Sequence, residues 1–158
     1  MGFDKINRAG KSAITRPNRW EHTYENHDAI PQICEKLVEI VNRSKATIVF
    51  SRDCSRLQDL HDQIVVEHSI QADIILQGDH SLTRVTLERF QRGEIPVLFL
   101  NLEAFSTGVN LSNADQCVFI DEDFNPVDNH VPQAECRAHR MGRKGQLGIG
   151  RINRSREL

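Results

Sequence analysis

The 158-residue chain lacks any long apolar run. No stretch approaches the roughly 20 apolar residues that span a bilayer. The first residues, Met1 to Lys5, are not followed by an apolar stretch of the signal-peptide type. Hydrophobic residues make up 39% of the chain and charged residues 27%. We therefore expect one globular, intracellular domain with a sizeable core and no membrane contact.

Two chemical motifs are also missing. None of the four cysteines forms a C-x-x-C pair, so we expect reduced thiols. The spacing of the cysteines and the seven histidines does not predict a metal site. Gly10-Lys11-Ser12 invites comparison with a phosphate-binding loop. That motif needs a glycine five positions before Gly10, where Lys5 stands. The chain therefore has no phosphate loop of its own.

Charge is close to balanced overall, at −2, but it is polarised along the chain. From Arg137 onward there are six arginines and one lysine against the single acid Glu157. The first twenty residues hold five cations against Asp4. This asymmetry favours polyanion binding at two places over a uniformly basic coat.

Apolar periodicity alternates between helical stripes and short apolar runs. It predicts helices at 28–43, 55–68 and 82–92, and strands at 47–51, 73–77, 96–100 and 116–121. Asp28 can cap the first helix and Gly93 can end the third. We expect a loop or short helix at 103–107, a basic helix at 133–141 and a last short strand at 147–152. Residues 1–27 lack periodicity and predict a flexible or extended lead-in, and 153–158 form a tail.

Alternation of helices with mostly apolar strands indicates an α/β fold, with a mostly parallel sheet and helices on both faces. In such a sheet, ligands bind beyond the carboxyl ends of the strands. Ser51, Gly78, Asn101 and Asp121 lie at those ends.

The most basic stretch is Gln133 to Gln146. Gln133, Arg137 and Arg140 are spaced i, i+4 and i+7, which places them on one face of a helix. Two guanidiniums on one face offer planar forks of donors to phosphate oxygens. On spacing alone, a solvated basic helix explains them as well.

Four blocks occur in a recognisable order: Ile48-Val-Phe-Ser51; Gln77-Gly78 with Arg84 and Phe90; Gly108-Val-Asn-Leu-Ser-Asn-Ala-Asp115; and Asp121-Glu-Asp-Phe-Asn-Pro126 followed by Gln133 to Gly142. Together they resemble the second RecA-like domain of superfamily 2 helicases and translocases, most closely the Swi/Snf chromatin-remodelling branch. The resemblance covers roughly residues 28–150. It implies a RecA-like three-layer sandwich over residues 28–152.

The resemblance implies the second lobe of a two-lobe, ATP-dependent motor. ATP and Mg²⁺ would be bound mainly by an N-terminal RecA-like lobe that this sequence lacks. By position, Arg137 and Arg140 match the arginine fingers, while Gln133, Gly108 and Asn110 match residues on the ATP side. Alone, the chain is expected to be inactive.

The same resemblance implies contacts with the backbone of double-stranded DNA. Ser51, Arg52, Arg84 and Arg143 are the candidates. Phosphate contacts of this kind hold the nucleic acid without reading its sequence. The expected location is the nucleus in a eukaryote and the cytoplasm in a prokaryote.

Departures from the family pattern leave alternatives open. The family's Ser-Thr-Arg-Ala-Gly-Gly run is replaced by Asn101-Leu-Glu-Ala-Phe-Ser106, which loses a hydroxyl and a cation that would face DNA. The exit Gly142-Arg-Lys-Gly-Gln146 is similar to the DEAD-box branch, and in that register the second finger falls on Gln146. The rival interpretations are a non-catalytic helicase-like module that binds protein or nucleic acid and, less favoured, an RNA helicase lobe.

Overall fold

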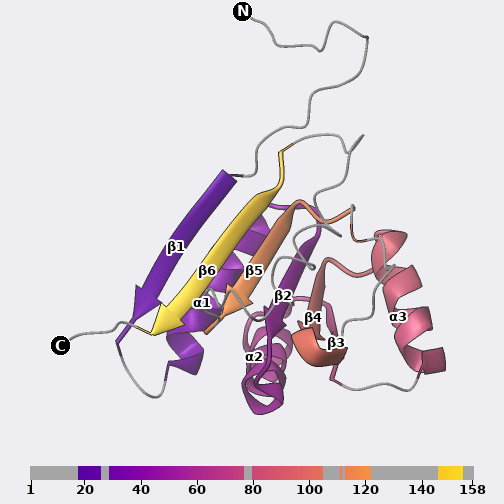
Figure 1. Cartoon of the computed structure of the whole chain (residues 1–158), viewed down its shortest axis with the longest axis horizontal. Coiled ribbons are helices and arrows are strands. Elements are labelled where there is room, and N and C mark those ends of the chain that lie inside the picture. Colours follow the sequence, from indigo (N-terminus) through magenta and orange to yellow (C-terminus); the bar gives the residue numbers. More distant parts are fainter. Residues whose placement is uncertain are drawn as a thin grey trace, which may run out of the picture.

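The computed structural model describes residues 18–25, 29–76, 80–104, 111, 113–121 and 146–154. One sheet runs through the molecule (Figure 1). Its strands are β1 (Asn18–Tyr24), β2 (Thr47–Ser51), β3 (Ala72–Ile75), β4 (Val97–Asn101), β5 (Gln116–Ile120) and β6 (Gly148–Arg154). The order is β1-β6-β5-β2-β4-β3, and every neighbouring pair is parallel. The predicted parallel α/β sheet is confirmed.

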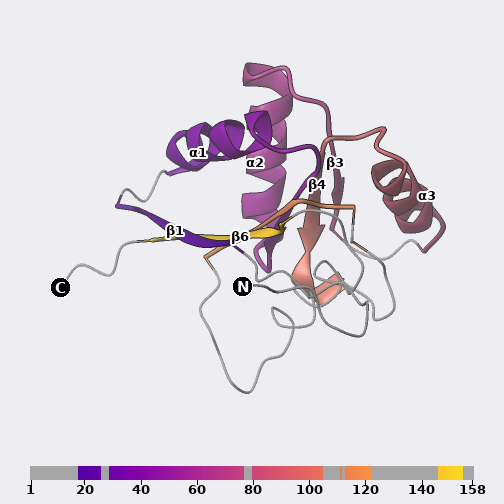
Figure 2. The same ribbon diagram turned by 90° about the horizontal axis from the view of Figure 1, so that it is seen from above.

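Helices cover both faces of the sheet, as predicted. α1 (Ile30–Asn42) and α2 (Cys54–Glu67) lie on the same side (Figure 2). α3 (His80–Gln91) packs on the opposite face, where Phe90 joins the core. A single 3-10 turn, η1 (Leu102–Ala104), follows β4 at the expected loop or short helix. Within the described ranges, no helix is long and apolar enough to cross a membrane.

The core forms two layers because strand side chains alternate between the faces. β2 is buried at every position, so it contributes to both layers. Towards α1 and α2, Val49, Phe99 and Val118 meet the apolar stripes of the two helices. Towards α3, the rings of Phe50 and Phe119 stack with centroids 4.9 Å apart.

Residues 18–24 correct the predicted lead-in. They form β1, which pairs with β6 from Asn18 opposite Gly148 to Tyr24 opposite Arg154. Along β1 the exposed side chains are mostly polar, whereas Tyr24 is buried and Trp20 packs against the α1 side of the core. Only one face of this edge strand is apolar, so its alternation of polar and apolar residues is weak and does not stand out from the polar sequence around it.

Helix ends follow local chemistry. The N-cap position of α1 is Ala29, which makes no side-chain cap hydrogen bond, and the predicted cap residue Asp28 lies outside the described residues. The pyrrolidine of Pro31 suits the first turn, where no amide donor is needed. α2 is capped by Asp53, whose carboxylate accepts from the Arg56 amide at 3.0 Å. Gly93, at φ 79°, follows the end of α3 as predicted.

Two glycines in β6 make room for side chains of the flanking strands. A Cβ atom on Gly150 would lie 2.0 Å from ring atoms of Trp20, and one on Gly148 would lie 2.4 Å from the Gln116 amide. The Trp20 indole N–H donates to Gln116 Oε1 at 3.3 Å. Side chains of β1 and β5 therefore meet across β6, above its two glycines.

Candidate functional site

All six strands are parallel, so their carboxyl ends lie at one edge of the sheet, where ligands of such folds bind. The described residues at this edge include Ser51, Asn101 and Asp121, as the sequence predicts. Tyr24 and Arg154 end β1 and β6 at the same edge. Gly78 lies outside the described residues.

Ser51 ends β2 in a buried position. Its hydroxyl accepts a hydrogen bond from the Asp53 amide at 3.1 Å, which shapes the turn into α2. Asp53 in turn caps that helix. Ser51 therefore has a structural role at the place where the sequence also predicts a phosphate contact.

Asn101 holds the loop that departs from the family pattern. Its buried amide accepts from the Glu103 amide at 2.7 Å and donates towards the Cys54 sulfur at 2.7 Å. Leu102, which replaces the family's threonine, is fully buried in the α3-side core. Glu103 is exposed. The side chain at position 102 is therefore absent from the surface, and the exposed residue next to it, Glu103, is an acid.

The two candidate DNA-contacting arginines that the structure describes lie in different places. Arg52 is half-buried directly after β2, beside Ser51. Arg84 lies on α3, with its side chain 81% exposed and Glu88 at 3.7 Å. An ion pair so exposed to solvent is weak, so the Arg84 guanidinium remains accessible to an anion.

The second half of the 108–115 block anchors the fold. Leu111 and Ala114 are fully buried. The Asp115 carboxylate accepts from the amides of Lys45 and Ala46 at 3.0 to 3.2 Å. The Asn113 side chain donates to the Phe90 carbonyl at 2.9 Å. These residues bind the block to the start of β2 and to the end of α3.

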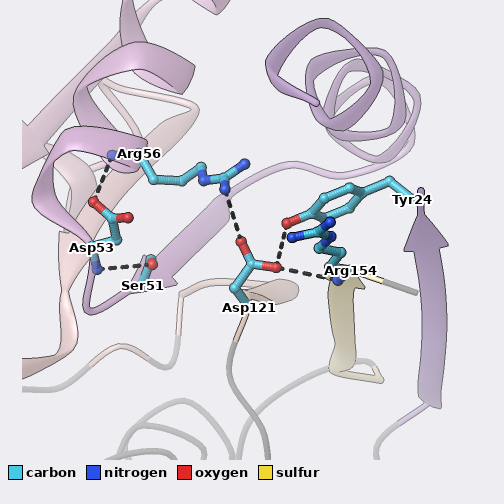
Figure 3. A network of polar contacts seen from close by, with 6 residues as sticks. All are labelled: Tyr24, Ser51, Asp53, Arg56, Asp121 and Arg154. Carbon is cyan, nitrogen blue, oxygen red and sulfur yellow. Dashed lines mark hydrogen bonds and ion pairs between the residues drawn. The ribbon is translucent and has the colours of Figure 1, made fainter. Parts of the chain in front are cut away.

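Asp121 is the centre of a polar network at the end of β5 (Figure 3). The Tyr24 hydroxyl donates to its Oδ1 at 2.5 Å, and the Arg154 amide donates to the same oxygen at 3.3 Å. The Arg56 guanidinium lies 3.6 Å from Oδ2. Asp121 itself has φ 56°, a left-handed conformation that Asp tolerates better than most residues. One carboxylate thus contacts β1, α2 and β6.

The chemistry of Tyr24 follows from this network. Burial, and after it the hydrogen bond to Asp121, together raise the pKa of its phenol to about 12. The Arg56 guanidinium lies 5.8 Å from the centre of the Tyr24 ring. Tyr24, Arg56 and Arg154 were not predicted as site residues. The signal that could have found Tyr24 was the alternation of Trp20, His22 and Tyr24 before the first helix.

Six of the predicted site residues lie outside the described residues: Gly108, Asn110, Gln133, Arg137, Arg140 and Arg143. The predicted basic helix at 133–141 lies outside them too. Four of these residues, Gln133, Arg137, Arg140 and Arg143, fall in the sequence between Asp121 and Gln146, which the structure describes. Residues 122–145 follow β5 and lead to β6, and these two strands are neighbours in the sheet. Among the described residues, no group of three or more His, Cys, Asp or Glu could hold a metal ion.

Residues 30–146 match the family described as "Helicase conserved C-terminal domain". The chain belongs to this family. The match begins at α1 and runs through the whole 122–145 segment, which the structure does not describe.

Relatives of the helicase domain are chromatin-remodelling proteins. It is 31% identical over 113 residues to a SWI/SNF-related matrix-associated actin-dependent regulator of chromatin subfamily A-like protein 1 of Drosophila melanogaster, covering 70% of this chain and 14% of that protein. It is 29% identical over 135 residues to a probable chromatin-remodeling complex ATPase chain of Oryza sativa subsp. japonica, covering 84% of this chain and 12% of that protein. The resemblance to the Swi/Snf branch is confirmed, and the chain spans about an eighth of each relative.

A solved structure shows the same fold. The C-terminal part of the Fun30 ATPase domain superposes with a TM-score of 0.68 at 20% identity, covering 84% of this chain and 44% of that one. The RecA-like lobe architecture of the helicase domain is confirmed.

Proposed function

We propose that the chain is the second motor lobe of an ATP-dependent DNA translocase of the Swi/Snf type. It supplies arginine fingers to ATP that is bound, with Mg²⁺, on a separate N-terminal RecA-like lobe, in the same longer protein or in a partner subunit. The carrying observation is that the family match runs through residues 122–145. That segment retains the spacing of Gln133, Arg137 and Arg140.

The chemistry of the fingers is electrostatic. Charge builds on the oxygens of the γ-phosphoryl group as it leaves, and Arg137 and Arg140 stabilise that charge. In related phosphoryl-transfer systems such a finger accelerates turnover roughly 10³- to 10⁵-fold. Gln133, Gly108 and Asn110 complete the ATP side of the second lobe.

Duplex DNA is bound through its phosphates. Arg84 is exposed on α3, and Arg52 lies at the carboxyl edge of the sheet. Arg143 adds a cation close to the fingers in sequence. Ser51, with a hydroxyl engaged in its own turn, contributes mainly by fixing the backbone there. Because the relatives are eukaryotic chromatin-remodelling proteins, the nucleus is the proposed location.

The test is ATP turnover by the two-lobe assembly with duplex DNA. Arg137→Ala and Arg140→Ala are expected to lower kcat by roughly 10³-fold or more. Arg43→Ala is the matched control, because Arg43 is an exposed arginine at the end of α1 that pairs weakly with Glu39 at 3.7 Å. Turnover unchanged by either finger variant would refute the motor.

One observation favours the second candidate, a non-catalytic module that binds protein or nucleic acid. Leu102 is in the core and Glu103 is exposed where the family places residues that face DNA. For such a module, binding persists in Arg140→Ala, and no ATP turnover appears in any assembly.

A further inference from the structure

The point where the chain leaves β5 is held more firmly than a strand end requires. The Asp121 amide donates to the Ile152 carbonyl at 2.9 Å, which continues the ladder with β6. Its carboxylate then contacts Tyr24, Arg56 and the Arg154 amide (Figure 3). Both the backbone and the side chain of this one residue are therefore fixed.

The position of Asp121 in the chain gives these contacts their importance. It is the last described residue before 122–145, the segment that carries the proposed fingers. Its φ of 56° is unusual for a residue other than glycine and costs free energy unless contacts maintain it. A rotation about this one residue would redirect the chain that follows.

We propose that Tyr24 and Arg56 are positioning residues that hold Asp121 in its left-handed conformation and so set the course of the chain into the finger segment. The inference rests on the proposed function, because it assigns these residues to the same motor site. It gives β1 a role in turnover, although β1 is the outermost strand on one side of the sheet and precedes the residues that match the family.

Burial and polarity suit Tyr24 to this task. Its side chain is 4% exposed, so solvent competes little for the hydroxyl. Its hydroxyl is protonated at neutral pH and donates to Asp121, and the pKa of about 12 extends this state into alkaline solution. Arg56 is itself anchored, since its amide donates to the cap residue Asp53.

The experiment compares Tyr24→Phe with Gln116→Met in the two-lobe assembly. Tyr24→Phe keeps the buried ring and removes only the hydrogen bond to the end of β5. Gln116→Met removes the bond that Trp20 makes to the start of β5, with little change in shape. We expect Tyr24→Phe to lower kcat about 10- to 100-fold, because misplacing a reacting group by about 1 Å has effects of that size, and to leave the KM for ATP unchanged. The kcat of Gln116→Met should stay within about twofold of that of the parent.

A second variant guards against a purely structural effect. Asp121→Asn keeps a residue that tolerates positive φ and loses the charge facing Arg56. It should lower kcat as Tyr24→Phe does, with melting temperatures of both variants close to that of the parent. The proposal is overturned if Tyr24→Phe behaves like Gln116→Met while Arg140→Ala abolishes turnover. If Arg140→Ala also leaves turnover unchanged, it is the proposed function that fails.

Discussion

Leu102 and Asp115 show how single residues of the family blocks divide between structure and chemistry. Leu102 is buried in the α3-side core, so a side chain that would face DNA in the family pattern instead stabilises the fold. Asp115 joins its block to the amides of Lys45 and Ala46. The block's remaining candidates, Gly108 and Asn110, are the ones proposed to meet ATP.

Tyr24 is the only tyrosine in the chain, which makes its ionisation a clean probe of the network. With the pKa raised to about 12, a folded chain at a pH of about 11 should show about a tenth of its tyrosine as phenolate, against about nine tenths for an unfolded chain. The measurement is a phenolate absorbance titration. In Asp121→Asn the midpoint should fall, because the negative charge beside the phenol is lost.

The raised pKa also fixes the sign of a pH effect on stability. The protonated phenol is favoured in the folded state, so its contribution is complete below a pH of about 10 and is lost as the pH rises through about 12. The free energy of unfolding of the parent should therefore fall relative to that of Tyr24→Phe as the pH rises from about 10 to about 12, because the variant has no phenol to ionise. A midpoint near the ordinary value of about 10 in the folded parent would contradict this account.

At the scale of elements, β6 depends on its neighbours' side chains as much as on its own. Trp20 from β1 and Gln116 from β5 meet above Gly148 and Gly150. A methyl group on Gly150 would occupy the space of the Trp20 ring, whereas one on Gly148 would meet only the end of the flexible Gln116 side chain.

Gly150→Ala should therefore destabilise the fold by about 1–3 kcal/mol through overpacking against Trp20. With Trp20→Ala as the background, the clash disappears, and the same change should be neutral or stabilising by up to about 1 kcal/mol, because alanine loses less backbone entropy in a strand. Chemical denaturation of the four proteins of the cycle measures the coupling. Additive effects would show that the two side chains do not compete.

Elements with strong patterns were predictable from sequence. β2 was predicted at its observed bounds because all five of its residues are buried and its apolar run is unbroken. The helices shifted by only one or two residues, mainly at their starts, where capping decides the boundary. β1 was missed because a strand at the edge needs only one apolar face, and its alternation is short.

The site was less predictable than the elements. That Ser51, Asn101 and Asp121 share an edge follows from parallel strands alone. The contact between Tyr24 and Asp121 joins residues 97 positions apart, and no local pattern encodes a pairing of that kind. It requires the neighbours of β6 to be known, since β6 lies between β1 and β5.

On the scale of the whole molecule, the chain is proposed to hold half of an active site. It has no phosphate loop in its sequence, and the match to its relatives covers a minor part of their length. The purified 158-residue chain should hydrolyse ATP no faster than background, and its turnover should appear only when a first lobe is added. Steady-state phosphate release checks this. Finger-dependent turnover by the chain alone would contradict the shared-site account.

The pairing of β1 with β6 has a consequence for synthesis on the ribosome. β1 is made first among the described elements, and its only strand partner in the described sheet, β6, is made last. Until Gly148 to Arg154 have been synthesised, β1 lacks its neighbouring strand, and Trp20 and Tyr24 cannot complete their burial in the sheet. Contacts between such distant segments also slow folding, because a long loop must close before they form. Completion of this lobe is therefore coupled to the release of its last strand.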